Sequence, residues 1–212
     1  MNFVHRFAYS VSNWNRGRKW ELFQGRFSPD ESLSILDVGF QDAQHQSADN
    51  YLEEHYEWPA KITALGIEEP VAFSQRYPEV KVVTYDGRNF PFEDGSFDIV
   101  WSNAVVEHVG DREAQVHFLR ETRRVGKRVF LTTPNRWFPV EVHTRIPLLH
   151  WLPKRWFDWI LYRADMKSFA GDYMRLLGLR ELTQLLAEAG FTESIVVKNK
   201  LGGPTLDFVV MA

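Results

Sequence analysis

The most informative part of this 212-residue chain is YDGRNFPFEDGSFDIVWSNAVVEHV, residues 85–109. It begins at the end of an apolar run, residues 80–85, and continues through a turn rich in Gly, Pro and Asp. A second apolar run, residues 97–101, follows the turn. Short apolar runs bounded by turn residues are typical of strands that are buried on both faces. The stretch therefore predicts two strands of an interior sheet.

Apolar runs and helical stretches alternate on either side of it. Further runs occupy residues 33–38, 62–67 and 128–132, and helical stretches lie at residues 48–55, 71–77 and 111–125. The last helical stretch is the clearest, because Asp111 can cap its start and Gly126 can end it. Strands that alternate with helices predict a parallel sheet covered on both faces.

The C-terminal residues predict a different connection. An apolar stripe at helical spacing, residues 179–189, is followed by two strand-like runs, residues 194–198 and 206–211. A turn with Gly-Gly-Pro and no helix separates the two runs, so they must pair antiparallel, or one must insert beside the other. We therefore expect five parallel strands with a hairpin at one end of the sheet.

The N-terminal residues 1–30 predict a helical segment of their own. Aromatic side chains alternate there with Arg6, Arg16, Arg18 and Lys19. Basic residues on an amphipathic helix usually face solvent, so we interpret these four as a solvated helix face.

Residues 134–173 interrupt the pattern. Four prolines fall in the first twenty of these residues, and nine of the 31 aromatic residues of the chain lie in the segment. Proline prevents a long helix, and the segment follows the fifth strand at the edge where open α/β sheets bind ligands. We expect an acceptor lid here, inserted into a sheet domain made of residues 31–133 and 174–212.

Composition excludes several kinds of protein. The chain has no cysteine, so disulfides, thiolate metal sites and a cysteine nucleophile are absent. Its formal net charge of −3 gives no broad attraction for nucleic acid, and no nucleic-acid partner is expected. No histidine or carboxylate spacing matches a compact metal motif. The N-terminal residues contain no long apolar stretch, so we expect a cytoplasmic protein without a signal peptide.

The ligand crevice of such a sheet opens at the carboxyl ends of its central strands. The residues at these ends fall in the ranges 37–41, 66–69, 86–88, 102–108 and 132–136. Gly39 allows the backbone to approach a ligand closely. Glu68 and Glu69 are candidates for a ribose hydroxyl pair, and Asp86 for an adenine amino group.

These residues resemble the class I S-adenosylmethionine-dependent methyltransferases. ILDVG, residues 35–39, is similar to the first motif of that family, and residues 85–109 match the later pattern. In that pattern an Asp follows the third strand, then come an apolar-Pro-Phe turn, D-x-S-F-D-x-V and an acid-His pair. The resemblance implies a three-layer α/β/α Rossmann-like methyltransferase fold. Its seven-stranded sheet is mostly parallel, with an antiparallel C-terminal strand.

The resemblance also implies S-adenosylmethionine as cofactor and a set of residues that hold it. Asp37 and Gly39 would line its methionine part, Glu68 its ribose, and Asp86 its adenine. The full set that we expect to bind the cofactor is Asp37, Gly39, Glu68, Asp86, Gly87, Arg88, Ser102 and Asn103.

Two positions depart from the family pattern. The first motif normally continues G-x-G-x-G, but here Gly39 is followed by Phe40, Gln41, Asp42 and Ala43. The strand end that is usually acidic carries Gly66, so Glu68 is the natural substitute. We expect the loop after Gly39 to run differently or to stand further from the donor.

Methyl transfer to an oxygen nucleophile needs a base, and histidine suits that role at neutral pH. His108 and His143 are the candidate catalytic residues. We expect the acceptor to contact Asn135, Arg136, Trp137 and His150, which follow the fifth strand or lie in the lid. The aromatic lid favours a small-molecule or lipid-like acceptor, or a contact with a membrane surface.

Two other functions fit parts of the sequence. The altered glycine motif is compatible with a non-catalytic module that binds S-adenosylmethionine and regulates a partner enzyme. A nicotinamide-dependent oxidoreductase ranks last, because the chain lacks the G-x-G-x-x-G fingerprint.

Overall fold

Seven strands form one sheet in the order β3-β2-β1-β4-β5-β7-β6. The computed structural model describes residues 3–43, 49–140, 146–166, 170–171 and 174–212, with side chains from Val11 onward in the first helix. The strands are β1 (Ile35–Val38), β2 (Ile62–Gly66), β3 (Lys81–Thr84), β4 (Ile99–Asn103), β5 (Val129–Pro134), β6 (Ile195–Lys200) and β7 (Thr205–Met211). Strands β1 to β5 pair parallel, and β7 pairs antiparallel with both β5 and β6. This arrangement confirms the predicted fold class.

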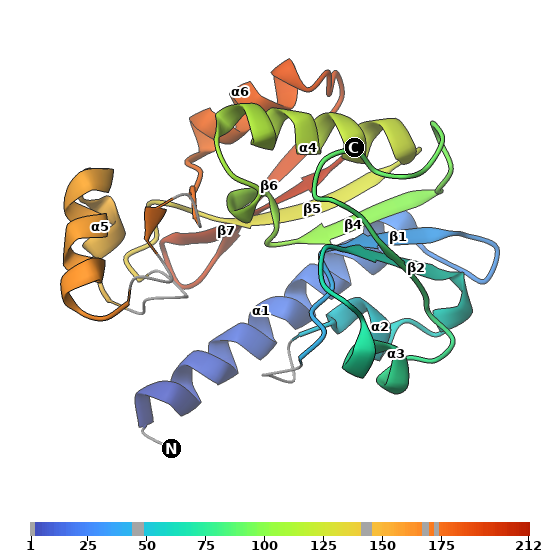
Figure 1. Ribbon diagram of the computed structural model, residues 1–212, viewed down its shortest axis with the longest axis horizontal. Helices are drawn as coiled ribbons and strands as arrows, with labels where there is room; N and C mark the ends of the chain where they lie inside the picture. The colour runs from blue at the N-terminus through green and yellow to red at the C-terminus, as the bar shows by residue number, and fades with distance from the viewer. Residues whose placement is uncertain (1–2, 44–48, 141–145, 167–169, 172–173) are drawn as a thin grey trace.

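Helices cover both faces of the sheet (Figure 1). The helices are α1 (Phe3–Phe27), α2 (Tyr51–His55), α3 (Val71–Arg76), α4 (Arg112–Val125), α5 (Lys154–Arg163) and α6 (Leu179–Glu188). Three short 3-10 helices complete the described elements: η1 (Pro59–Lys61), η2 (Val106–His108) and η3 (Leu149–Trp151). Helix α4 begins and ends as predicted, because the Asp111 carboxylate accepts the Ala114 N–H at 2.9 Å and Gly126 follows its last turn.

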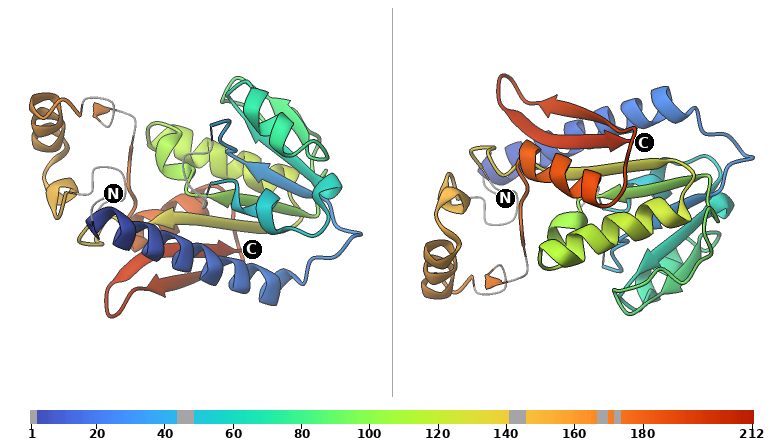
Figure 2. Two further views of the ribbon diagram at one scale, coloured as in Figure 1. Left: turned by 90° about the horizontal axis from the view of Figure 1, so that it is seen from below. Right: turned by 90° about the horizontal axis from the view of Figure 1, so that it is seen from above.

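Each face of the sheet has its own apolar core, because successive strand residues point to opposite faces. Leu36 and Val38 of β1 pack with apolar residues of α4 and α6. Ile35 of the same strand packs with Phe23 of α1 and Phe73 of α3. The two views in Figure 2 show α1 along one face and the pair α4 and α6 on the other.

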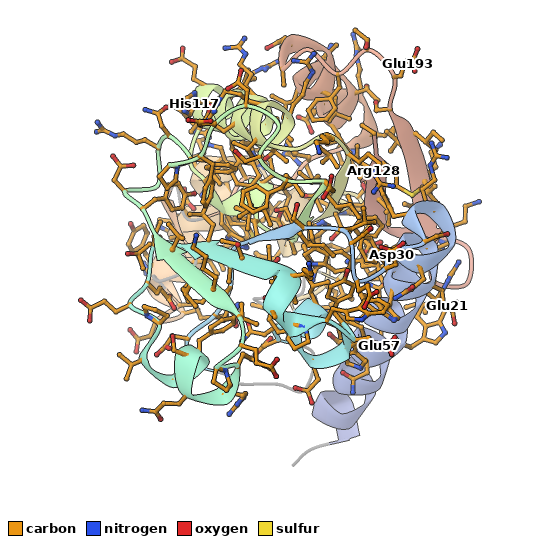
Figure 3. The ribbon with its side chains drawn as sticks, turned by 90° about the vertical axis from the view of Figure 1, so that its right-hand side faces the viewer. Glu21, Asp30, Glu57, His117, Arg128 and Glu193 are labelled. Carbon is orange, nitrogen blue, oxygen red and sulfur yellow. The ribbon has the colours of Figure 1, made fainter. Side chains whose placement is uncertain are left out.

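Many aromatic residues lie between α1 and the sheet. Trp101 of β4 stacks on Phe130 of β5, with ring centroids 4.6 Å apart, and Phe23 meets Trp101 edge to face at 4.9 Å. At the other end of the cluster the Arg128 guanidinium lies 5.5 Å from the Phe27 ring centroid. Arg128 is labelled in Figure 3. Part of the aromatic content of the chain therefore fixes the N-terminal helix to the sheet.

The prediction that the basic residues of α1 form a solvated face was wrong for Lys19. Its side chain is buried and lies 2.7 Å from the Asp207 carboxylate of β7. The Lys19 ammonium also lies 3.2 Å from the Thr132 hydroxyl. A periodicity argument cannot see this contact, because its partners lie more than 100 residues away in the sequence.

The described part of the lid forms a small core of its own. Phe157 and Leu161 of α5 pack with Leu149, Ala170 and Met174. The prolines keep the first part of the segment free of long helix, as expected, but α5 itself was not predicted. It starts directly after Pro153, a residue that is tolerated at a helix start.

Candidate functional site

The loop after β1 brings the backbone close to η2. Gly39 has a φ of +102°, and a Cβ placed on it would lie 2.4 Å from the Val105 side chain. Both the positive φ and the short distance require glycine here. The structure thus gives Gly39 a packing role against Val105, and its predicted approach to a ligand stays a prediction.

The two departures from the family pattern, Gly66 and the loop after Gly39, are in contact. Phe40 is buried against the end of β2, where a Cβ added to Gly66 would lie 2.5 Å from its ring. The Phe40 ring also packs on Phe73 of α3, with centroids 4.7 Å apart. Gly66 therefore makes room for the buried Phe40 side chain.

Hydrogen bonds hold the beginning and the end of this loop together. Asn50 accepts the Gln41 N–H at 2.9 Å and donates to the Gln41 carbonyl oxygen at 2.8 Å. Asp42 accepts the Phe73 N–H at 2.9 Å. The altered loop is thus a defined structure around Gln41 and Asp42 without the further glycines of the family motif.

A small cavity of about 40 Å³ lies between α1, the β1 loop and the end of β4. The charged residues that line it are Arg16, Asp37 and Asp49, and its other lining residues are Val38, Gly39, Gln41, Asn50, Tyr51, Trp101 and Asn103. One guanidinium therefore faces two carboxylates, a charge pattern that complements an α-amino acid zwitterion. Of the predicted cofactor residues, the structure brings Asp37, Gly39 and Asn103 together here.

Asp37 and Glu53 form a buried carboxyl pair beneath this cavity. Burial raises the pKa of Asp37 to about 6, which interaction with Glu53 and the charge of Arg16 partly oppose. Burial and the neighbouring Asp37 carboxylate raise the pKa of Glu53 well above its usual range. Glu53 therefore keeps its proton more readily than Asp37, and Asp37 is the member that ionises near neutral pH.

A second group of predicted residues lies at the exposed ends of β2 and β3. The Asp86 carboxylate accepts the Arg88 N–H at 2.9 Å and stays exposed, and Gly87 has a φ of +80°. Beside Gly87 the Ile67 side chain is 70% exposed. A carboxylate next to an exposed apolar side chain offers a hydrogen-bond acceptor and a flat contact to an aromatic base.

Glu68 lies on the same exposed edge. Its carboxylate is 3.4 Å from the Asp42 N–H, on the altered loop. The contact joins the loops that follow β1 and β2, and the ribose role of Glu68 stays a prediction.

Strand β4 runs two residues beyond its predicted end, which separates the roles of Ser102 and Asn103. Ser102 is buried, with its hydroxyl 3.5 Å from the Val38 carbonyl oxygen of β1. Asn103 accepts the Thr132 hydroxyl at 2.6 Å and the Lys19 ammonium at 3.3 Å. Ser102 thus contacts the sheet, whereas Asn103 lines the cavity and is held by α1 and β5.

The turn within residues 85–109 is held by α4. Arg124 donates to the Phe90 and Phe92 carbonyl oxygens at 3.0 and 2.7 Å and to the Asp94 carboxylate at 2.9 Å. Glu121 accepts the Phe90 N–H at 2.8 Å. The Arg124 guanidinium lowers the pKa of the Glu121 carboxyl. These contacts fix the turn at residues 90–94 against α4.

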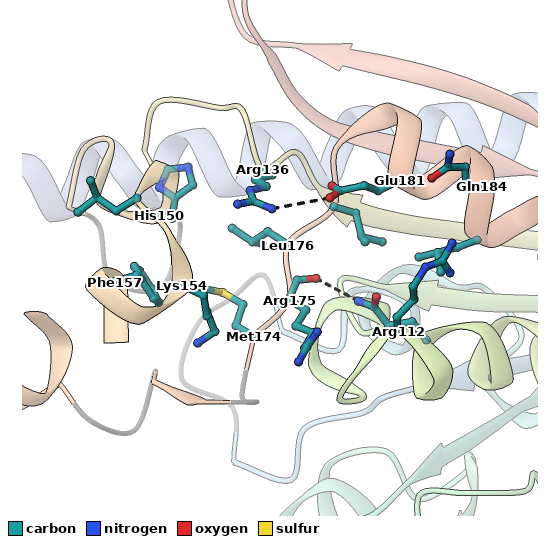
Figure 4. Close-up of a pocket in the computed structure, with 14 residues that line it drawn as sticks. Arg112, Arg136, His150, Lys154, Phe157, Met174, Arg175, Leu176, Glu181 and Gln184 are labelled. Atoms are coloured by element: carbon teal, nitrogen blue, oxygen red, sulfur yellow. Dashed lines mark hydrogen bonds and ion pairs between the residues drawn. The ribbon is translucent and has the colours of Figure 1, made fainter. Parts of the chain in front are cut away.

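A larger cavity of about 390 Å³ separates the lid from α4 and α6 (Figure 4). Its four cationic side chains are Arg112, Arg136, Lys154 and Arg175. The remaining lining residues are Gln115, His150, Leu152, Phe157, Met174, Leu176, Leu177, Glu181, Gln184 and Leu185. Glu181 is the one acidic residue among them, so the cavity combines an apolar wall with an excess of positive charge.

One short segment, residues 103–107, contacts residues that line each of the two cavities. Asn103 lines the small cavity, and η2 begins three residues later. Gln115, which lines the large cavity, donates to the Val106 carbonyl oxygen at 3.1 Å. The Arg175 N–H donates to the Glu107 carbonyl oxygen at 2.8 Å. Segment 103–107 therefore connects the walls of both cavities.

Two of the four predicted acceptor residues line the large cavity. Arg136 lies 3.7 Å from the Glu181 carboxylate, and His150 is buried with Nε2 2.9 Å from the Phe138 carbonyl oxygen. Since a carbonyl oxygen only accepts, Nε2 carries the proton of this hydrogen bond.

The other two predicted acceptor residues lie just outside. Trp137 is exposed, next to Arg136, whose guanidinium lies 5.6 Å from its ring centroid. Asn135 donates to the Thr205 carbonyl oxygen at 2.8 Å and accepts the Trp137 N–H at 3.1 Å. Asn135 thus stabilises the turn that carries Arg136 into the cavity.

The described part of the structure does not bring the predicted catalytic histidines into either cavity. His108 ends η2, and the described linings of the two cavities do not include it. His143 lies outside the described residues. Within the described ranges, no group of three or more histidines and carboxylates is arranged to hold a metal ion.

Sequence reasoning missed several residues of the small cavity. Arg16 was assigned to a solvated face, and Asp49 and Tyr51 precede or begin a helix that carried no recognised motif. The positive charge of Arg16 was the one sequence feature that could have pointed to a site. Nothing in the local pattern predicts that α1 lies across the end of β4. Ile67 was read as the end of a strand, although it is exposed.

Comparison with known proteins agrees with this geometry. Residues 36–129 match the family model described as "Methyltransferase domain". A probable S-adenosylmethionine-dependent methyltransferase of Mycobacterium tuberculosis is 30% identical over 134 residues, which are 62% of this chain and 39% of the relative. The chain thus spans about two fifths of the length of the curated relatives it matches.

Solved structures share the fold at low sequence identity. A methyltransferase of Thermotoga maritima, described as a possible histamine N-methyltransferase, has a TM-score of 0.59 at 17% identity, covering 99% of this chain and 95% of its own. The 1,6-didemethyltoxoflavin-N1-methyltransferase of Burkholderia thailandensis, solved with S-adenosylhomocysteine, has a TM-score of 0.58 at 16% identity, covering 99% and 83%.

The residues at the strand ends also suit the cofactor of that family. The small cavity offers opposite charges for an amino acid group, and Asp86 with Ile67 offers a polar and an apolar contact for a base. Residues 36–129 thus match a methyltransferase domain, and the sheet has the topology of the class I S-adenosylmethionine-dependent methyltransferases.

Proposed function

We propose that this protein transfers the methyl group of S-adenosylmethionine to a small-molecule or lipid-like acceptor bound in the large cavity. The observation that carries the proposal is that segment 103–107 joins the two cavities: Asn103 lines the small one, and residues that line the large one donate to the Val106 and Glu107 carbonyl oxygens. One cavity has the charges of an amino acid site and the other has a mixed cationic and apolar wall. Donor and acceptor would thus be held by residues that contact the same short segment.

The small cavity supports binding of the methionine part of the donor. Arg16 suits the carboxylate of the donor, while Asp37 and Asp49 suit its ammonium group. Asp86 and Ile67 would hold the adenine, and Glu68 the ribose. Bound there, the donor supplies an activated methyl group.

The large cavity supports an acceptor that is partly apolar and carries a negative group. Phe157, Met174 and Leu177 supply the apolar wall, and Arg136 and Arg175 supply positive charge. A site of about 390 Å³ has the volume of a small-ligand pocket. The acceptor class that fits this wall is an amphipathic carboxylate or phosphate.

The protein contributes mainly by position and by exclusion of water. Holding two reactants in line contributes about 7–11 kcal/mol to such a reaction. The lid closes the large cavity on the side of Phe157 and His150. An acceptor hydroxyl or ammonium would need a base to take its proton. His108 and His143 are the predicted candidates for that base.

An acceptor screen tests the proposal. Labelled S-adenosylmethionine is incubated with matched pairs of acceptors, amphipathic acids and their neutral amides or esters, and release of S-adenosylhomocysteine is followed. We expect turnover of acids that Arg136→Met reduces at least tenfold and Arg76→Met, on the exposed α3, leaves unchanged. Binding of the donor without turnover of any acceptor would favour the regulatory module instead.

A further inference from the structure

The outward face of α5 has an unusual composition for a surface helix. At about 100° per residue, five side chains fall within an arc of about 120°: Arg155, Trp156, Trp159, Tyr162 and Arg163. All five are exposed, with Trp156 and Trp159 51% exposed and Tyr162 62% exposed. A soluble helix normally turns polar residues outward, so this face needs another explanation.

The opposite face of α5 is occupied by the lid core. Phe157 and Leu161 are buried there, and Phe157 also lines the large cavity. The three exposed aromatic side chains therefore do not serve the packing of the lid. Figures 1 and 2 show α5 at the outer end of the molecule, away from the helices that cover the sheet.

The charges on α5 favour an anionic partner. Its one acidic residue, Asp158, is paired with Lys154 at 2.5 Å. Arg155 lies 5.8 Å from the Trp156 ring centroid, and Arg163 lies 5.0 Å from that of Trp159. The outward face thus presents two guanidinium groups on a chain whose overall charge is negative.

We propose that the outward face of α5 docks on the surface of a lipid bilayer that contains anionic lipids. Tryptophan and tyrosine place an apolar ring and a polar edge at the level of the headgroups, and arginine binds their phosphates. The described helices include none that is long and apolar enough to cross a membrane. The contact is therefore peripheral, with α5 lying in the plane of the interface.

The docked orientation has a consequence for the large cavity. Lys154 and Phe157 of α5 line that cavity while the arc from Arg155 to Arg163 faces the bilayer. The lid would then stand between the membrane surface and the acceptor cavity. Docking itself does not depend on methyl transfer and can be measured without donor or acceptor.

Vesicle binding of the full chain tests the proposal. Cosedimentation is measured with vesicles of phosphatidylcholine alone and with 30% phosphatidylglycerol. We expect binding to the anionic vesicles that weakens as salt rises from 50 to 500 mM. Trp156→Ala/Trp159→Ala and Arg155→Gln/Arg163→Gln should each lower the partition coefficient at least tenfold. Trp14→Ala removes an exposed tryptophan of α1 and should leave it unchanged.

Three results would overturn the proposal. The first is no binding of the wild type to anionic vesicles, and the second is equal binding by the wild type and both double variants. The third is a dimer, seen by analytical ultracentrifugation, that only the Trp156→Ala/Trp159→Ala variant dissolves, since the face would then belong to a second copy. Unchanged thermal unfolding and S-adenosylhomocysteine binding of the variants exclude a folding defect as the cause.

Discussion

The ammonium group of Lys19 lies 2.7 Å from the carboxylate of Asp207, and both side chains are buried. Asn15 also donates to this carboxylate at 2.7 Å, and Asn103 accepts the same ammonium at 3.3 Å. The N-terminal helix is thereby joined to β7 and β4 at the edge where the small cavity opens. Helix α1 is thus part of the candidate donor site.

Breaking this ion pair should destabilise the protein strongly. Lys19→Ala leaves the Asp207 carboxylate buried without its cation, and loss of one partner of a buried pair costs about 3–5 kcal/mol. The free energy of unfolding from urea titration measures this. Arg112→Ala breaks the exposed pair with Glu188 and should cost no more than about 1 kcal/mol. Equal effects of the two substitutions would contradict the role given to Lys19.

The fit between Phe40 and Gly66 predicts a non-additive double mutant. Gly66→Ala places a Cβ 2.5 Å from the Phe40 ring and should cost about 1–3 kcal/mol of unfolding free energy. In a Phe40→Ala background the same change meets no ring, so its cost should fall close to zero. A full, unchanged cost in that background would show that Gly66 serves something other than Phe40.

The raised pKa of Asp37 predicts a pH-dependent stability. Below about pH 4 this carboxyl is protonated in both folded and unfolded chains. As pH rises toward 6, the unfolded chain loses the proton while the folded chain keeps it, because the folded pKa is about 6. The unfolded state is then favoured by up to about 3 kcal/mol.

The comparison with Asp37→Asn isolates this contribution. The wild type should lose stability relative to the variant between pH 4 and 6, and the difference should level off above pH 6. Unfolding free energies at five pH values provide the measurement. A difference that stays constant, or that favours the wild type as pH rises, would mean that the folded protein does not hold Asp37 in its protonated form.

Arg16 should contribute to donor affinity through its charge. Arg16→Met keeps most of the aliphatic stem and removes the guanidinium that faces Asp37 and Asp49. We expect S-adenosylhomocysteine to bind at least tenfold more weakly, whereas adenosine, which lacks the amino acid group, should bind about as before. An equal loss for both ligands would place Arg16 elsewhere in the site.

Local signals were enough to predict that the chain forms a sheet and in what order strands and helices follow one another along the sequence. The apolar runs, the cap at Asp111 and the turn before β7 depend on neighbouring residues, and the structure has each of them where expected. The prediction that the run at residues 80–85 is buried on both faces was wrong, because β3 is the edge strand and none of its residues is buried. Strand ends were less accurate, since β4 continues to Asn103. That shift moved Ser102 from the predicted loop into the sheet.

Contacts between distant residues could not be predicted. Lys19 looks like any surface lysine until α1 is placed across β7, and Arg16 enters the small cavity for the same reason. The contact between Phe40 and Gly66 could not be seen in the sequence, where the altered loop and Gly66 appeared as unrelated departures from the family pattern. Helix α5 was hidden because its outward face is aromatic and breaks the usual polar pattern.

The most direct test of the donor site is calorimetric titration of the full chain with S-adenosylhomocysteine, for the wild type and for Asp86→Ala. Asp86 is exposed and its carboxylate accepts only the nearby Arg88 N–H among the hydrogen bonds described, so the substitution should leave the fold intact. We predict saturable binding at one site and a loss of affinity of more than tenfold in Asp86→Ala. No heat of binding with the wild type, or equal affinities for both proteins, would contradict the donor site described here.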